Sequence, residues 1–191
     1  MDLKQAEQLA RETLSAKRFQ HTLNVRDQAV HLAKKYGADP DKAALAALLH
    51  DIAKELPREE SLQIFKDNAI MAENAAQRPA PVWHGICAAI LCQTRWGITD
   101  PEVLSAIACH TTGKPGMSRM DKIIFLADMT CAERSYPEVY ELRELCEEDL
   151  DKAMVTALGM NIAWMEESGK PIDPMSRETY EDLRRSYNGG N

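Results

Sequence analysis

The stretch Asp39-Pro40-Asp41-Lys42-Ala43-Ala44-Leu45-Ala46-Ala47-Leu48-Leu49-His50-Asp51-Ile52-Ala53-Lys54 sets the expected fold. Aspartate before proline is typical of a helix N-cap followed by proline at the first helical position. From Lys42 to about Lys54 the segment carries apolar residues on every side, as a fully buried helix does. We therefore expect this segment to be the central helix of the protein.

The rest of the chain also has helical periodicity, and no clear strand, repeat or inter-domain linker interrupts it. Gly37, the Pro79-Ala80-Pro81 break and the loop at residues 112–116 separate predicted helices. Outside the central segment, helices are predicted near residues 3–13, 18–35, 59–66, 83–94, 100–111, 118–130, 138–146, 149–167 and 176–186. We therefore expect an all-α protein.

Composition limits the classes of function. The chain has 191 residues, of which 45% are hydrophobic, and this suits a single globular domain over residues 1–191. The formal net charge of -7 argues against broad binding to nucleic-acid backbones. The polar N-terminus lacks the apolar core of a signal peptide, and no apolar run is long enough to span a bilayer.

Cysteine usage favours a reducing compartment. The five cysteines are an odd number without a close CxxC pair, which argues against a disulfide framework or a zinc knuckle. We therefore expect a cytoplasmic protein with free thiols and with no nucleic-acid or membrane partner. The sequence is compatible with a homodimer but does not set the oligomeric state.

Residue types that bind metals lie in apolar helical contexts. His50-Asp51 ends the central apolar run, where burying an imidazole and a carboxylate costs free energy unless partners are present. His21 lies on the preceding helix, and Asp128 follows the apolar run 123–127. Mixed histidine and carboxylate ligation suits iron, manganese, zinc or a pair of such ions, so we expect a metal site.

Taken singly, these residues are not specific, because a lone histidine on an amphipathic helix or a lone aspartate in an apolar run is more often structural. Their order along the chain, His, His-Asp, then Asp, is more specific. His84 begins one predicted helix and His110 ends another; both could bind a second metal, although we favour contact with phosphate or water. His31 has no evident partners and is interpreted as a surface or core residue.

Three further residues could hold phosphate. Lys54 projects near the same helix face as His50-Asp51, or it is a solvated lysine at a helix end. Thr111 could donate a hydrogen bond to phosphate, or it simply precedes a glycine stop. Arg134 could clamp a phosphate through its forked guanidinium, or it lies on the surface.

Several segments resemble the HD-domain phosphohydrolases, and more narrowly the bacterial YqeK family of symmetrical bis(5′-nucleosyl)-tetraphosphatases. The resemblance runs from about residue 16 to 136, and HDxAK together with HTTG and AD is more specific than the HD pair alone. The matching segments are Arg18-Phe19-Gln20-His21-Thr22, Leu48-Leu49-His50-Asp51-Ile52-Ala53-Lys54, His84-Gly85, Ala106-Ile107-Ala108-Cys109-His110-Thr111-Thr112-Gly113, Lys122-Ile123-Ile124-Phe125-Leu126-Ala127-Asp128 and Arg134.

The resemblance implies a helical HD domain with its motif core at about 16–136 and helices 138–187 packing on it. It implies a site with one or two iron ions, with manganese or another divalent metal as the alternative, that hydrolyses diadenosine tetraphosphate to two ADP. The implied metal ligands are His21, His50, Asp51 and Asp128. From the chemistry of these side chains we expect Asp51, Asp128 and Lys54 to be the catalytic residues. The implied nucleotide contacts are Arg18, Lys54, His84, His110, Thr111 and Arg134.

The chain departs from the family pattern at two places. Cys131-Ala132 stands where we expect a Glu-Pro pair, and Ile172-Asp173-Pro174 stands where we expect an Ile-His-Pro-like segment followed by an Ala-Arg-Asn-like one. These differences bear on base or ribose recognition more than on the metal core.

Other activities remain open from the sequence. The bare HD core would equally suit a nucleotidase acting on deoxynucleoside monophosphates. A non-catalytic nucleotide sensor is disfavoured because every expected ligand is present, and a cyclic-dinucleotide phosphodiesterase because no Gly-Tyr-Pro signature follows the HD pair.

Overall fold

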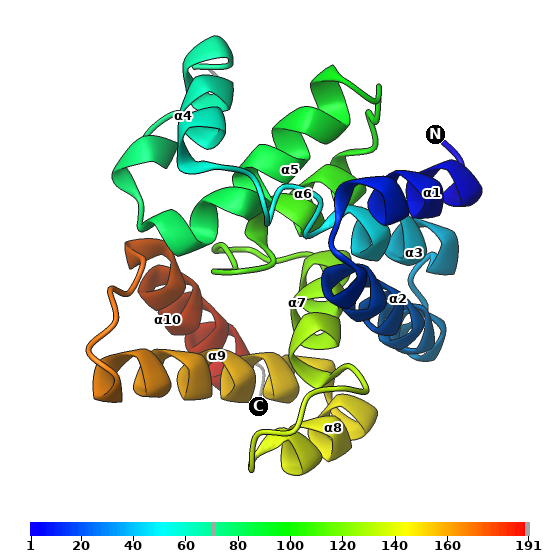
Figure 1. Cartoon of the computed structure of the whole chain (residues 1–191). Coiled ribbons are helices and arrows are strands. Elements are labelled where there is room, and N and C mark those ends of the chain that lie inside the picture. Colours follow the sequence, from blue (N-terminus) through cyan, green and yellow to red (C-terminus); the bar gives the residue numbers. More distant parts are fainter. Residues whose placement is uncertain (70–71, 190–191) are drawn as a thin grey trace.

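The computed structural model describes residues 1–69 and 72–189, and within them it contains helices and no strand (Figure 1). This confirms the all-α prediction. The α-helices are α1 (Leu3–Thr13), α2 (Ala16–Tyr36), α3 (Pro40–Leu49), α4 (Arg58–Asp67), α5 (Trp83–Thr94), α6 (Pro101–Cys109), α7 (Arg119–Thr130), α8 (Val139–Glu148), α9 (Leu150–Glu167) and α10 (Pro174–Gly189), with short 3-10 helices η1 (Ala75–Gln77) and η2 (Ala80–Val82). None of the helices in the described part of the chain combines the length and the apolar character that crossing a bilayer requires.

Helix α3 is the buried centre of the N-terminal half, as its composition predicts. It packs against α1, α2, α6 and α7, and its side chains from Ala46 to Leu49 are at most 1% exposed. The Asp39 side chain caps it by accepting hydrogen bonds from the backbone N–H groups of Asp41 (2.9 Å) and Lys42 (3.2 Å). Because alanine is small, α2 and α6 can approach this helix closely from two sides.

The predicted extension of this helix to about Lys54 is wrong. The α-helix ends at Leu49, and the chain continues in tight turns in which Ile52 N donates to Leu49 O (3.2 Å) and Lys54 N to Asp51 O (2.8 Å). These bonds join residues three apart, so the backbone winds more tightly than an α-helix. His50 and Asp51 therefore lie on a turn at the end of α3 rather than on its face.

Other helices begin or end at the residues whose capping signals predicted it. Gly37 ends α2 with a left-handed φ of 67°, and Asp100 caps α6 as Asp39 caps α3. Ser118 and Asp121 form the predicted capping box of α7. Helix α10 begins two residues earlier than predicted because the Asp173 carboxylate accepts a hydrogen bond from the backbone N–H of Met175 (2.9 Å).

The C-terminal helices lie along the other side of α7 from α1–α3 (Figure 1). Helix α7 contacts α2 and α3 as well as α8 and α9, and α10 packs on α9. Helix α10 also reaches the loop at residues 112–116, since Gly116 N donates to Asp182 Oδ2 (2.8 Å) and Gly113 lies against the Thr179 side chain. The last helix thus supports the loop that follows His110.

Candidate metal centre

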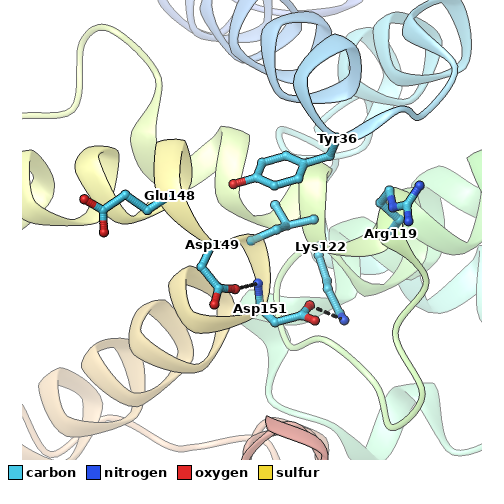
Figure 2. Close-up of a pocket in the computed structure, with 7 residues that line it drawn as sticks. Tyr36, Arg119, Lys122, Glu148, Asp149 and Asp151 are labelled. Carbon is cyan, nitrogen blue, oxygen red and sulfur yellow. Dashed lines mark hydrogen bonds and ion pairs between the residues drawn. The ribbon is translucent and has the colours of Figure 1, made fainter. Parts of the chain in front are cut away.

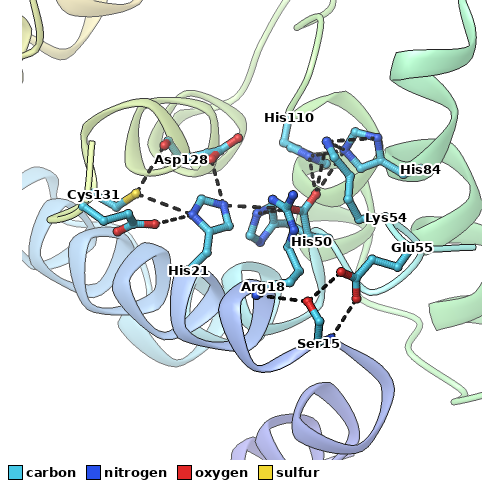
Figure 3. Close-up of polar contacts among 12 residues, drawn as sticks. Ser15, Arg18, His21, His50, Lys54, Glu55, His84, His110, Asp128 and Cys131 are labelled. Carbon is cyan, nitrogen blue, oxygen red and sulfur yellow. Dashed lines mark hydrogen bonds and ion pairs between the residues drawn. The ribbon is translucent and has the colours of Figure 1, made fainter. Parts of the chain in front are cut away.

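Four histidines and two aspartates from separate parts of the sequence converge on one buried point (Figure 3). Helix α2 presents His21, the turn after α3 presents His50 and Asp51, and α7 presents Asp128. The first turn of α5 presents His84, and the C-terminal end of α6 presents His110. All are buried except Asp128, which is half-buried.

Three of the imidazoles are oriented by the same kind of hydrogen bond to the backbone. The Nδ1 atoms of His50, His84 and His110 lie 2.6, 2.9 and 2.7 Å from carbonyl oxygens three residues earlier in the chain. A carbonyl can only accept, so each Nδ1 carries the proton and donates it. Each Nε2 therefore presents a lone pair to the centre, which is the tautomer that a metal ligand requires.

The Asp51 carboxylate lies between two pairs of imidazoles. Its Oδ2 is 3.8 Å from His21 Nε2 and 3.6 Å from His50 Nε2, while its Oδ1 is 3.1 Å from His84 Nε2 and 3.7 Å from His110 Nε2. One oxygen thus faces each pair. This arrangement lets a single carboxylate serve two neighbouring ligand sets.

Asp128 completes the first of these sets. Its Oδ1 lies 3.1 Å from His21 Nε2, and one oxygen of Asp128 lies within 4.8 Å of a ring nitrogen of His50 and one of His110. Among the groups of ligand atoms in the described residues, two share Asp51: His21 and His50 lie on one side of it, and His84 and His110 on the other.

The centre contains polar atoms that the protein itself does not satisfy. His21 Nε2, His50 Nε2 and Asp51 Oδ1 are buried and have no hydrogen-bond partner among the described residues. In addition, His84 Nε2 and His110 Nε2 are 3.0 Å apart, although Nδ1 carries the proton in both rings. Facing lone pairs repel unless a cation lies near them, and buried polar groups without partners cost free energy. The donor set therefore fits metal ions.

Burial controls the protonation of the imidazoles. Removal from water lowers the pKa of His50 and of His84 to about 4, so both are neutral ligands near pH 7. Burial also acts to lower the pKa of His21, but the neighbouring Asp128 and Glu133 carboxylates outweigh it and raise the value. A metal ion would displace that proton from Nε2.

The two carboxylates stay ionised. Burial acts to raise the pKa of Asp51, but the surrounding imidazoles and the Lys54 ammonium hold it well below its ordinary value. For Asp128 the same burial effect is outweighed by the neighbouring His21 imidazole and the Arg134 guanidinium, which lower its pKa strongly. Both side chains are therefore anionic at neutral pH, as metal ligands must be.

Three cations border the centre. Arg18 Nη1 donates to Asp51 Oδ2 (2.9 Å), and Lys54 Nζ lies 3.7 Å from Asp51 Oδ1 and 3.1 Å from His84 Nε2. Arg134 donates from Nε to the Asp128 carbonyl (2.8 Å) and from Nη2 to the Asp128 carboxylate. The predicted phosphate-binding cations Arg18, Lys54 and Arg134 thus all lie beside a predicted metal ligand.

A cavity of about 590 Å³ borders the centre at His21, and the cations Arg18 and Arg134 also line it. Its lining residues are Ser15, Lys17, Arg18, Gln20, His21, Asn24, Glu55, Glu133 and Arg134.

Not every predicted residue reaches the centre. Thr111 follows His110 in a turn and is half-buried, and no hydrogen bond from its side chain is found among the described residues. Its neighbour Thr112 instead accepts from Arg78 Nη2 (3.1 Å). His31 pairs with Glu147 on the surface (2.7 Å).

Sequence reasoning did not single out Glu133 or Arg78. Glu133 contacts His21 Nδ1, and Arg78 pairs with the buried Asp173 (2.7 Å) as well as with Thr112. Asp173 is the residue that departs from the expected Ile-His-Pro-like segment. That departure, and the one at Cys131-Ala132, were the available signals for both contacts.

A second cavity, of about 440 Å³, lies between the C-terminal end of α2 and the start of α9 (Figure 2). Several charged side chains in its lining already have partners within the protein. Lys122 pairs with Asp151 (2.6 Å), and Asp149 accepts a hydrogen bond from the backbone N–H of Asp151 (2.9 Å). It has no histidine in its lining, and it lies apart from the convergent cluster. The cluster around Asp51 is therefore the candidate site.

Known proteins resemble the chain over nearly its whole length. The HD domain family model matches residues 18–133. The symmetrical bis(5′-nucleosyl)-tetraphosphatase of Bacillus subtilis is 34% identical over 94% of this chain and 96% of its own, and the one of Halalkalibacterium halodurans is 37% identical over 96% and 97%. A crystal structure from Clostridium acetobutylicum, described as a predicted HD superfamily hydrolase involved in NAD metabolism, superposes with a TM-score of 0.91 at 33% identity, covering 97% of this chain and 98% of that one.

The matched range includes His21, His50, Asp51 and Asp128, which are the residues that the fold gathers around one point. By this geometry and by these similarities, the chain belongs to the HD-domain family and, within it, to the symmetrical bis(5′-nucleosyl)-tetraphosphatases.

Proposed function

We propose that the protein is a hydrolase that cleaves diadenosine tetraphosphate, and related dinucleoside polyphosphates, symmetrically into two ADP. The observation that carries this proposal is the position of the buried Asp51 carboxylate. Two imidazoles face each of its oxygens, and the cations Arg18 and Lys54 lie beside it. Such a site suits an anionic substrate that is rich in phosphate. The names of the relatives support a dinucleoside tetraphosphate as the substrate.

The residues divide into two ligand sets for a pair of divalent ions. His21, His50 and Asp51 would hold the first ion together with Asp128, which lies 3.1 Å from His21, and Asp51, His84 and His110 would hold the second, with Asp51 shared. We propose iron, because the resemblance implies it and the mixed imidazole and carboxylate donors suit it, with manganese as the alternative. An ion held there lowers the pKa of a bound water and polarises a phosphoryl oxygen.

The protein's own residues would bind and orient the substrate. Lys54, Arg18 and Arg134 can neutralise phosphate oxygens, and Arg134 can do so through a fork of two N–H donors. Asp128 accepts from Arg134 and lies next to His21, so it can also accept a hydrogen bond from the attacking water. Water adds to one of the two middle phosphorus atoms, and the bond from that phosphorus to the oxygen bridging to the other middle phosphorus breaks.

We propose that the site also determines which bond breaks. If Arg18, Lys54 and Arg134 hold one ADP-like half, the attacked phosphorus lies at a set distance from that nucleoside. The leaving half is then also ADP. We place the reaction in the cytoplasm, in keeping with the five cysteines, which are all free and buried in the described structure.

A product analysis tests the proposal. Diadenosine tetraphosphate is digested with the iron-loaded or manganese-loaded protein, and the nucleotides are separated by chromatography. ADP should be the sole product and should inhibit the reaction by occupying the same half-site. Equal amounts of ATP and AMP would refute symmetrical cleavage. Release of nucleoside from a deoxynucleoside monophosphate, without tetraphosphate cleavage, would point to the nucleotidase instead.

A further inference from the structure

Of the four imidazoles at the centre, His21 alone is not oriented by a backbone carbonyl. Its Nδ1 contacts the Glu133 carboxylate, which the turn after α7 supplies. Because an ionised carboxylate can only accept, Nδ1 carries the proton and Nε2 faces Asp51 and Asp128. The Glu133 carboxylate thus orients His21 in the same way as the backbone carbonyls of Ala47, Pro81 and Ile107 orient the other three rings.

The Glu133 carboxylate is itself held in place. Its second oxygen accepts a hydrogen bond from Asn24 Nδ2 (2.6 Å), one helical turn after His21 on the same helix. Both oxygens of Glu133 are therefore engaged by α2. The neighbouring Cys131 Sγ lies 3.8 Å from His21 Nδ1, but a thiol is a weak acceptor and cannot replace the carboxylate.

The turn that carries Glu133 is organised from α8. Arg143 donates from Nε to the carbonyl of Thr130 (2.9 Å) and from Nη2 to those of Cys131 (2.7 Å) and Arg134 (3.0 Å). One guanidinium thus binds carbonyls on both sides of Glu133. The position of the carboxylate is fixed before any ligand binds, although the Glu133 side chain is 38% exposed.

We propose that Glu133 is a positioning residue for the metal centre, which acts through His21 by fixing its ring tautomer and orientation. The proposal rests on the metal centre inferred above but not on the identity of the nucleotide.

The first test measures ion binding without nucleotide. Calorimetric titration of metal-free protein with Mn²⁺ should show that Glu133→Ala weakens affinity by about 10–100-fold, the usual effect of removing the partner of a ligating histidine. Glu133→Gln should lie between that variant and the unchanged protein, because its carbonyl can accept from Nδ1 if Asn24 turns its amide. Cys131→Ser is the matched control and should bind Mn²⁺ as the unchanged protein does.

The second test measures the tautomer of the His21 ring by NMR spectroscopy. In metal-free protein labelled with ¹⁵N-histidine, the His21 signals should show protonated Nδ1 and unprotonated Nε2 when recorded above its pKa, and Glu133→Ala should lose this preference. Arg143→Ala, which loosens the turn, should shift the same signals in the same direction. At saturating Mn²⁺, Glu133→Ala should lower kcat and leave KM unchanged.

Unchanged Mn²⁺ affinity together with an unchanged His21 tautomer in Glu133→Ala would overturn the proposal, as would a loss of affinity in Cys131→Ser that Glu133→Ala does not share. Neither measurement uses a nucleotide. A failure of the proposed hydrolytic activity would therefore be seen separately, in the product analysis.

Discussion

Gly85 allows α5 to approach the C-terminal end of α6, and replacing it with alanine should separate His84 from His110. A Cβ at this position would lie 3.1 Å from the carbonyl oxygens of Ile107 and Ala108 and 3.2 Å from the His110 ring. Two of these neighbours are backbone atoms, which no side-chain rotation can move away. Helix α5 must therefore shift by a few tenths of an ångström relative to α6.

The shift has an energetic cost and a local consequence. Overpacking of this kind costs about 1–3 kcal/mol, and the better helix propensity of alanine offsets about 1 kcal/mol of it. We expect Gly85→Ala to lower the free energy of unfolding by roughly 0–2 kcal/mol. The Ile107 carbonyl also orients His110, so the same shift should weaken the ligand set formed by Asp51, His84 and His110.

Urea unfolding and metal analysis of Gly85→Ala measure the two effects. Gly159→Ala is the matched control, since its new Cβ would lie 3.2 Å from the Tyr180 ring between α9 and α10, away from the centre. The control should keep its full metal content, whatever its effect on stability, because the Tyr180 side chain lies away from the centre. Wild-type metal content and turnover in Gly85→Ala would refute the reasoning about this close approach.

Three further predictions concern the same centre. Asp51→Ala should lose hydrolysis and most of the bound metal, because both ligand sets share this carboxylate; full activity and metal content in that variant would contradict the assignment. Lys54→Ala and Arg134→Ala should keep the metal but raise KM or lower turnover for the nucleotide, as steady-state kinetics and metal analysis can show; unchanged constants would remove both residues from the substrate site. Burial holds the pKa of His50 and His84 at about 4, against 6.5 in the unfolded chain, so metal-free protein should lose stability as the pH falls from 6.5 toward 4. The unfolded state alone takes up these protons in that range, so urea titrations should show a loss of roughly 3 kcal/mol per histidine, and a free energy of unfolding that does not fall with pH would contradict their buried, neutral state.

Most helices could be predicted from the sequence because their ends carry local signals. Asp39-Pro40, Asp100-Pro101 and the Ser118 capping box each place a donor or acceptor where the backbone needs one, and the structure contains all three. The end of α3 at Leu49 was not predictable in this way. Apolar residues continue through Ile52 and Ala53, and they are buried equally well by an α-helix or by tighter turns.

Some residues of the candidate site could likewise be predicted from the sequence, and others could not. His50, Asp51 and Asp128 stand out in the sequence because a polar residue in an apolar run is costly unless it has partners. Glu133 and Arg78 lie in loops, where a charged side chain is normally solvated, so the only sequence signals for them were the departures at Cys131-Ala132 and Asp173. Their contacts with His21 and Asp173 join residues 112 and 95 positions apart, and such distant contacts follow only from the tertiary fold.

The contact of α10 with the loop after His110 has a consequence for the order of folding. The core of the centre forms where α2, α3 and α7 pack together, and the turns that orient its rings are local. The loop at residues 112–116, in contrast, is held by Asp182, 66 positions later in the chain, and by Arg78, which also binds Asp173. Closing such long segments loses more chain entropy than forming a helical turn, so these contacts should form late. The site is thus expected to assemble in two stages, with its first ligand set in place before the loop beside the second set becomes fixed.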